Sequence, residues 1–260
     1  MNLQLKDKVV LITGGAKGIG AATARLIGEE GGIPVIVDRD KQAGDGLCDE
    51  LRQAGMRCSM IGVDLSSAAH CSQAVQHAVK AFGQLDALIN NAGVNDRVGL
   101  EHGTPEQYQA SLQRNLLHYY DMAHYAVLHL KRSRGSIINV ASKTAITGQG
   151  GTSGYASAKG AILALTREWA VELLPYGIRV NAIVPAEVMT DMYRQWLGSF
   201  PNSEEKLQTI VSKIPLGKRM TTPEEIAAMI VFLISAKAQH ITGQHVVVDG
   251  GYIHLDRAIT

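Results

Sequence analysis

Three side chains, Ser142, Tyr155 and Lys159, have the types and spacing needed to move a proton. Tyr155 and Lys159 are four residues apart, so they share one face of a helix. A phenol has an unperturbed pKa of about 10, which is too high for an efficient base near neutral pH. A neighbouring ammonium favours the phenolate and lowers that pKa. The three residues predict acid–base chemistry on a hydroxyl or carbonyl group, although a Tyr-x-x-x-Lys pair alone is also common on helix surfaces.

A glycine-rich segment, Thr13 to Gly20, links the apolar run Val9 to Ile12 to a helical pattern that starts at Ala21. Glycines there permit a tight turn and let the backbone approach a pyrophosphate, which the N–H groups of the helix N-terminus can bind. No Gly-Lys-Ser/Thr is present, which disfavours a nucleoside-triphosphate loop. The alternative is an ordinary turn between a strand and a helix. The predicted phosphate-binding residues are Gly14, Lys17, Gly18, Ile19 and Gly20.

The second predicted strand ends at Asp38, 18 residues after Gly20. A carboxylate at this position accepts hydrogen bonds from the adenosine ribose and repels a 2′-phosphate, which favours NAD over NADP. Arg39 and Lys17 are cations that can pair with a phosphate, so NADP remains possible.

The hydrophobic pattern of the sequence predicts the strands and helices that carry these residues. Nearly continuous β-branched runs, typical of strands buried on both faces, occur at 9–12, 34–37, 58–63, 85–89, 136–140, 179–183 and 245–248. Helical periodicity occurs between them at 21–31, 68–82, 105–131, 154–174 and 223–235. The alternation predicts an α/β fold, a single doubly wound Rossmann domain over residues 1–260 with a seven-stranded parallel sheet flanked by helices. Ser142 follows one of these strands, at the sheet end where such folds bind ligands.

Composition excludes several classes of partner. The formal net charge is +1, from 25 basic and 24 acidic residues, which gives no reason to expect a nucleic acid or an anionic membrane. No apolar stretch of about 18 residues occurs, so we expect no membrane span. Three cysteines without a CxxC spacing argue against a disulfide framework and favour the cytoplasm. We also predict no metal site, because no HExxH occurs and His118, His124 and His129 do not share a helix face.

Several motifs together resemble the short-chain dehydrogenase/reductase family over essentially the full chain. They are TGxxxGxG at Thr13 to Gly20, Asn90-Asn91-Ala92-Gly93, Asn115, Ser142, and Tyr155-x-x-x-Lys159. The resemblance implies an NAD(P)-dependent oxidoreductase in which Tyr155 is the general base or acid. Ser142 would hold the reacting oxygen, Lys159 would bind the nicotinamide ribose, and Asn115 would support a proton-carrying water chain.

The same resemblance implies further cofactor-binding positions. Asp64 and Leu65 match the pair that holds the adenine, and Val188 and Thr190 match residues at the nicotinamide carboxamide. Ala186 stands where the family usually has glycine. The remaining positions are Asn91, Ala92, Gly93 and Pro185, and Tyr155 and Lys159 also belong to this set.

The candidate substrate residues are largely polar, which favours a ligand rich in hydroxyl groups over an acyl chain or a steroid. They are Asn95, Ser142, Lys143, Gln149, Tyr155, Glu187 and Trp196, with Trp196 expected to stack on a sugar face. Lys143 is also consistent with a solvent-facing position. Residues 188–213 are expected to form a lid over the substrate.

The segment Pro185 to Thr190 and the ending Asp249 to Ala258 resemble bacterial sugar dehydrogenases of the L-fucose dehydrogenase type. This resemblance implies oxidation of an aldose at its anomeric carbon to a lactone. The alternatives are a reductase of a ketone such as a 3-oxoacyl chain, and a non-catalytic NAD(P)-sensing protein. Family resemblance also implies a homotetramer, with the tail His254 to Thr260 reaching a neighbouring subunit.

Overall fold

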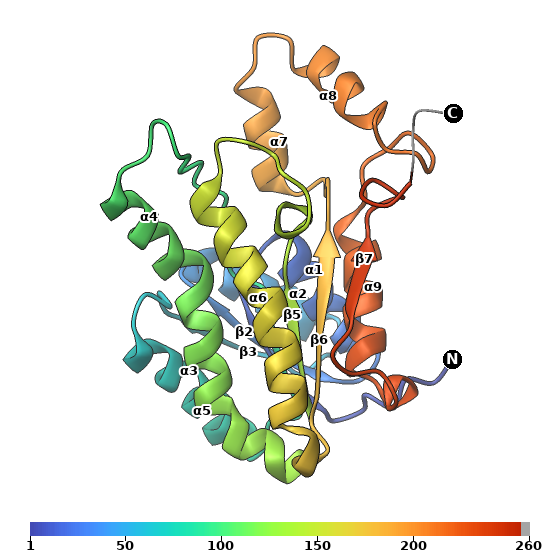
Figure 1. Ribbon diagram of the computed structural model, residues 1–260. Helices are drawn as coiled ribbons and strands as arrows, with labels where there is room; N and C mark the ends of the chain where they lie inside the picture. Colours follow the sequence, from blue (N-terminus) through green and yellow to red (C-terminus); the bar gives the residue numbers. More distant parts are fainter. Residues whose placement is uncertain (256–260) are drawn as a thin grey trace.

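The computed structural model describes residues 1–255 and consists of one parallel sheet covered by helices on both faces (Figure 1). Its seven strands lie in the order β3-β2-β1-β4-β5-β6-β7. Their bounds are β1 Val9–Thr13, β2 Ile33–Asp38, β3 Ser59–Gly62, β4 Ala87–Asn90, β5 Ser136–Val140, β6 Arg179–Pro185 and β7 His245–Val248. The predicted seven-stranded parallel sheet in a single domain is confirmed.

The strand order reverses between β1 and β4, and open α/β sheets bind ligands at such a switch point. Every residue of β1 and β5 is buried, as the continuous apolar runs predict. The helices are α1 Gly18–Glu29, α2 Lys41–Gln53, α3 Ala68–Phe82, α4 Pro105–Leu112, α5 His118–Ser133, α6 Ser153–Glu172, α7 Asp191–Gly198, α8 Ser203–Val211 and α9 Pro223–Ile234. Short 3₁₀ turns occupy Lys143–Ala145, Leu174–Tyr176 and Ala236–Ala238.

Two hydrophobic cores lie on the two faces of the sheet. One contains buried side chains of α3, α5 and α6, and the other contains those of α1, α2 and α9. Figure 1 shows α4, α5 and α6 together on one face, with α9 behind β6 and β7 on the other face. Because both faces are buried, the position of each strand within the sheet is fixed. The side chains that meet at the carboxyl end of the sheet are therefore fixed as well.

The predicted helix 105–131 is helical throughout, from Pro105 to Ser133, but its hydrogen-bonding pattern changes in the middle. It is divided into α4 and α5 by a π-helical turn, Gln113–Leu117, that contains Asn115. The Asn115 side chain accepts a hydrogen bond from Val94 N at 2.7 Å and donates one to Ser111 O at 3.1 Å. These side-chain bonds compensate for the irregular backbone, and π turns of this kind are frequent at functional sites.

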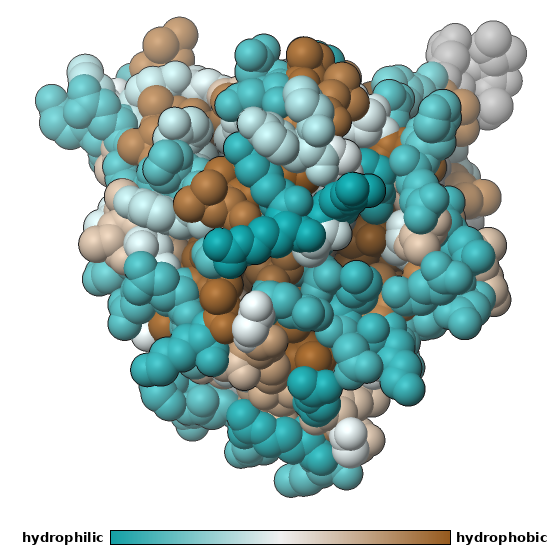
Figure 2. Space-filling view, turned by 90° about the horizontal axis from the view of Figure 1, so that it is seen from below, coloured by the Kyte–Doolittle hydropathy of each residue, from teal (hydrophilic) through white to brown (hydrophobic). Residues whose placement is uncertain are grey.

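Helices α7 and α8 lie beyond the carboxyl ends of the strands (Figure 1). Figure 2 looks onto the opposite end, where hydrophilic side chains predominate and hydrophobic ones show in the gaps between them. None of the helices within residues 1–255 is long and apolar enough to cross a lipid bilayer. The tail predicted to reach a neighbouring subunit falls largely outside the described residues.

Candidate active site

A cleft of about 860 Å³ opens at the carboxyl ends of the central strands. It is lined by the glycine-rich segment after β1 and by the residues that follow β2, β3, β4, β5 and β6. Most of the predicted cofactor-binding and catalytic residues are among them: Gly14, Lys17, Gly18, Ile19, Asp38, Arg39, Asp64, Leu65, Asn91, Ala92, Gly93, Ser142, Tyr155, Lys159, Pro185, Val188 and Thr190. The structure therefore brings together residues that the sequence separates by more than 170 positions.

The glycine loop has the conformation that a pyrophosphate site requires. Gly14 and Gly18 have positive φ values of 60° and 53°, which side chains rarely adopt. Gly20 is buried behind the loop, and a Cβ at this position would collide with the Gly14 carbonyl oxygen. Helix α1 begins at Gly18, so its free N–H groups face the cleft. This geometry fits a dinucleotide.

At the adenosine end, the Asp38 carboxylate is fixed by the backbone. One oxygen accepts from Ala16 N at 3.1 Å and the other from Asp40 N at 3.0 Å. The Lys17 ammonium is paired with Asp40 at 2.6 Å, and this pair lies in solvent. In this structure the Lys17 ammonium is therefore held by Asp40.

Asn91 connects the loop after β4 to the first strand. Its amide nitrogen donates to Thr13 O at 3.0 Å and to Gly14 O at 2.9 Å. The Thr13 hydroxyl in turn accepts from Asn91 N at 2.9 Å. These bonds hold the two sides of the switch point at a fixed separation, with Ala92 and Gly93 exposed to the cleft.

Tyr155 and Lys159 lie one turn apart on α6, and Ser142 follows β5. The Lys159 Nζ atom is 5.6 Å from the centre of the Tyr155 ring. Burial raises the pKa of Tyr155 to about 12, while a hydrogen bond with Ser142 acts in the opposite direction. Burial also lowers the pKa of Lys159 to about 7. Burial thus disfavours the charged form of both groups, and a bound cation beside them would favour the phenolate.

The predicted proton-relay residue Asn115 is fully buried behind this site. A Cβ placed on Gly93 would lie 3.1 Å from Asn115 Oδ1 and 3.4 Å from Lys159 Nζ. Glycine at position 93 therefore leaves the narrow space that separates Asn115 from Lys159 free of a side chain.

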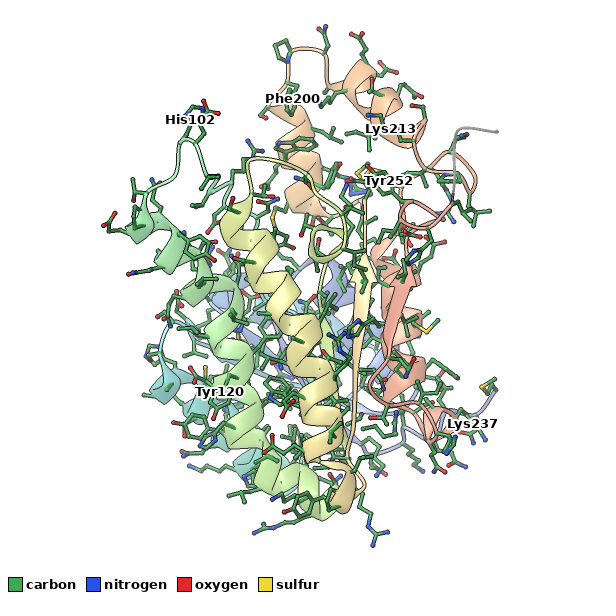
Figure 3. All side chains as sticks on the ribbon, in the orientation of Figure 1. His102, Tyr120, Phe200, Lys213, Lys237 and Tyr252 are labelled. Carbon is green, nitrogen blue, oxygen red and sulfur yellow. The ribbon has the colours of Figure 1, made fainter. Side chains whose placement is uncertain are left out.

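A second polar cluster lies beside the cleft. Lys143 pairs with Glu187, and their side chains are only 10% and 12% exposed. The Tyr193 hydroxyl donates to the other Glu187 oxygen at 2.6 Å, and the Lys143 ammonium lies 4.3 Å from the centre of the Tyr252 ring. Figure 3 shows Tyr252 on the same side of the molecule as the α7 segment. A solvent-facing position for Lys143 is thereby wrong, because the ion pair holds the chain inside.

The other predicted substrate residues lie further out. Trp196 on α7 packs edge-on against Tyr193 at 5.0 Å, with Arg97 5.8 Å from its ring centre. Asn95 accepts a hydrogen bond from Arg97 N at 3.2 Å, and Gln149 is exposed. None of Asn95, Lys143, Gln149, Glu187 or Trp196 lines the cofactor cleft itself.

Several residues at the site were not predicted from the sequence, and three of them make specific contacts. Tyr193 lines the cleft and donates a hydrogen bond to Glu187. Asp40 forms an ion pair with Lys17, and the Tyr119 hydroxyl accepts a hydrogen bond from Lys159. Tyr119 had no usable signal in the sequence, because its contact is with Lys159, 40 positions further along the chain. Within residues 1–255, no group of three or more His, Cys, Asp or Glu side chains is placed to hold a metal ion.

The chain is similar to proteins of a known family. Residues 14–253 match the family model described as enoyl-(acyl carrier protein) reductase. The chain is 33% identical to 3-oxoacyl-[acyl-carrier-protein] reductase FabG of Thermotoga maritima, over 96% of this chain and 100% of that one. It is 37% identical to the L-fucose dehydrogenase of Oryctolagus cuniculus, over 94% of this chain and 84% of that one.

Two solved structures extend the comparison. The Cj0485 dehydrogenase has a TM-score of 0.94 and 46% identity, covering 99% of this chain and 98% of the other. The L-sorbose reductase of Gluconobacter frateurii, in complex with NADPH and L-sorbose, has a TM-score of 0.94 and 27% identity, covering 98% of this chain and 100% of the other.

Fold, cleft and relatives together define a class of nucleotide-dependent oxidoreductases. The chain belongs to the short-chain dehydrogenase/reductase family and is an NAD(P)-dependent oxidoreductase. Its relatives include both sugar dehydrogenases and ketone reductases, so the family alone leaves the substrate open.

Proposed function

We propose that this enzyme oxidises an aldose of the L-fucose type at its anomeric carbon to the lactone, with NAD as the acceptor. The observation that carries the proposal is the polar cluster of Lys143, Glu187 and Tyr193 beside the cleft. Such a wall offers charged and hydroxyl groups to a sugar, whereas an acyl chain needs mostly apolar walls. The similarity to L-fucose dehydrogenase supports the same assignment.

The proposed step breaks one C–H and one O–H bond. The Tyr155 phenolate takes the proton of the anomeric hydroxyl while Ser142 hydrogen-bonds the oxygen that becomes the carbonyl. NAD⁺, when bound, accepts the hydride from C1. Lys159 holds the ammonium that favours the phenolate, and Asn115 supports return of the proton to solvent.

Substrate orientation is assigned to residues around the second cluster. Glu187 and Asn95 would bind ring hydroxyls, with Lys143 holding the Glu187 carboxylate in place. Trp196 would stack on the apolar sugar face. Gln149 would come into contact with the substrate only when residues 188–213 close as a lid, because it is exposed here.

Preference for NAD is assigned to Asp38. Its carboxylate is held at the ribose end by two backbone N–H groups, and the nearby Lys17 is already paired with Asp40. Arg39 remains as the cation that could accept a 2′-phosphate, because it lines the cleft and is exposed.

Reduction of a 3-oxoacyl chain is the second candidate, favoured by the similarity to FabG and by the description of the matching family model. It uses the same Ser142, Tyr155 and Lys159. The difference lies in the substrate wall, since a long chain would have to pass the buried Lys143–Glu187 pair.

We also propose a homotetramer assembled through the outer surfaces of α5 and α6. Large apolar side chains there are exposed, including Leu128 at 65% and Val171 at 68%. Apolar side chains exposed together on a surface are typical of contact sites.

The test is to follow the near-ultraviolet absorbance of reduced nicotinamide with NAD⁺ or NADP⁺ and a panel of free aldoses that includes L-fucose. The matched control is the methyl glycoside of each active sugar, which lacks the free anomeric hydroxyl. We expect turnover with a free sugar and none with its glycoside. Turnover of a 3-oxoacyl thioester with reduced cofactor, and of no sugar, would contradict the proposal.

A further inference from the structure

Tyr119 on α5 is a fully buried phenol whose hydroxyl lies at the catalytic lysine. Its oxygen accepts a hydrogen bond from Lys159 Nζ at 2.9 Å and donates one to Val140 O at 2.9 Å. Burial and the negative charge that Tyr155 can carry raise the pKa of Tyr119 well above its usual value. Tyr119 therefore stays neutral. Its hydroxyl donates its one hydrogen bond to the Val140 carbonyl oxygen, and the lone pairs of the hydroxyl oxygen can accept from Lys159.

The Lys159 amine is held at two points. Besides Tyr119, it donates to Val140 O at 2.7 Å. An ammonium has three N–H donors in tetrahedral directions, so fixing two of them determines where the third one points. Lys159 lines the cofactor cleft, and the third donor is the one available to a ligand there.

We infer that Tyr119 is a positioning residue, whose hydroxyl keeps the Lys159 ammonium charged and aims its remaining N–H at the cofactor ribose. The effect of Tyr119 on hydride transfer passes entirely through Lys159, since Tyr119 is buried and does not line the cleft.

Simple core packing does not account for the hydroxyl. The Tyr119 ring fills the core between α3, α5 and α6, and a phenylalanine ring would fill the same space. The hydroxyl adds an acceptor for a buried cation that has no carboxylate partner within residues 1–255. A hydrogen bond to a charged group is stronger than one between neutral groups, and it is strongest in a dry interior.

Other titratable groups around Lys159 are few. Tyr155 lies one turn earlier on α6, and His118 neighbours Tyr119 on α5, while β5 contributes only the Val140 carbonyl. Burial lowers the pKa of His118 to about 4, so it is neutral where Lys159 titrates. Removing the Tyr119 oxygen should then lower the pH at which Lys159 loses its proton.

The first experiment measures NADH binding by its fluorescence across pH in the wild type and in Tyr119→Phe. The matched control is Tyr120→Phe, because Tyr120 is the next residue on the same helix, is 54% exposed and points away from the sheet (Figure 3). We expect NADH affinity to fall as Lys159 deprotonates, and this transition to move to lower pH only in Tyr119→Phe. An unmoved transition would overturn the inference. The binding measurement needs no substrate, so its result does not depend on whether the proposed sugar substrate is correct.

The second experiment measures kcat against pH with whichever substrate is active. Tyr119→Phe should lower kcat by about ten- to a hundredfold and shift the acid limb to higher pH, because Tyr155 loses the help of the charged ammonium. In a Lys159→Met background, Tyr119→Phe should cause no further loss. Additive losses would show that Tyr119 acts elsewhere.

A fluorinated tyrosine at position 119 covers the case in which Tyr119→Phe does not fold. It keeps the ring and the hydroxyl but makes the oxygen a weaker acceptor. The NADH-binding transition should again move to lower pH by a smaller amount, and an unchanged transition would contradict the inference.

Discussion

Lys159 occupies a position where a charge is costly. It is 2% exposed, and burial lowers its pKa to about 7 from the usual 10.5. The unfolded chain therefore binds this proton more readily than the native protein does, and the native state is penalised below pH 10.5. The penalty is complete at and below pH 7, so this residue makes stability rise with pH between 7 and 10.5.

Replacing the amine with an apolar side chain should relieve that penalty. We predict that Lys159→Met, without cofactor, unfolds at a higher temperature than the wild type, by roughly 5 °C at pH 7. The gain should disappear by pH 10.5. Calorimetry at several pH values checks this, and a Tm difference that does not depend on pH would contradict it.

Asp38 is the residue to which we assign the choice between NAD and NADP. Asp38→Asn keeps an oxygen for the Ala16 or Asp40 N–H group but removes the charge. We predict that the ratio of kcat/KM for NADP to that for NAD rises about tenfold, because a nearby negative charge repels a phosphate by ~1 kcal/mol or more. Lys17→Gln is the matched control and should not raise that ratio. An unchanged ratio in Asp38→Asn would mean that another residue selects the cofactor.

The sequence identified these residues because their chemistry depends on local spacing. Ser142, Tyr155, Lys159 and Asp38 are marked by a helix turn or by the end of a strand. The contact between Tyr119 and Lys159 joins residues 40 positions apart and depends on how α5 and α6 pack against β5. No periodicity in the sequence specifies such a contact, so Tyr119 became visible only in the structure.

Among the elements, helix α7 is linked to the segment that follows β6 by the hydrogen bond from Tyr193 to Glu187. The Thr190 hydroxyl caps α7 by accepting from Tyr193 N at 3.3 Å, so the tyrosine that contacts Glu187 lies in the first turn. The pKa of Tyr193 is raised above its usual value by burial and by the Glu187 charge. Tyr193 therefore remains a hydrogen-bond donor at every working pH.

We predict that Tyr193→Phe raises KM for the proposed sugar substrate by about tenfold, since a hydrogen bond to a charged group is lost and α7 is less firmly held to Glu187. KM for NAD should change much less. Steady-state kinetics with both substrates varied provides the measurement, with Tyr176→Phe, at a half-exposed site away from the cleft, as control. A larger effect on NAD than on the sugar would place Tyr193 at the cofactor instead.

Sequence patterns predicted the element types well and their interruptions poorly. Periodicity gave α3 and α9 nearly to the residue, because their apolar faces repeat regularly. The π turn between α4 and α5 was not predicted, since it accompanies side-chain bonds of Asn115 to Val94 and Ser111 that periodicity does not show. Helix α2 was also not predicted, although Leu47, Cys48 and Leu51 repeat at helical spacing and Asp40 caps its first turn.

For the whole molecule, the parallel sheet was predictable because each strand is a short, buried, β-branched run.

The association of subunits is tested separately from the fold. We predict a tetramer by analytical ultracentrifugation, and a smaller species for Leu128→Glu/Val171→Glu, since burying two carboxylates in an apolar contact is costly. Lys237→Glu, at an exposed site far from α5 and α6, is the control (Figure 3). A double variant of unchanged mass would exclude this surface.

In the proposed reaction, Tyr155 transfers the proton when a sugar gives its anomeric hydride to NAD. The direct measurement compares reduced-nicotinamide formation from L-fucose and NAD⁺ by the wild type and by Tyr155→Phe, with NADH binding determined for both. We predict that the substitution lowers kcat by ~10²–10⁴-fold, while the affinity for NADH stays within about threefold of the wild-type value. Turnover by Tyr155→Phe close to that of the wild type, with binding intact, would contradict the mechanism.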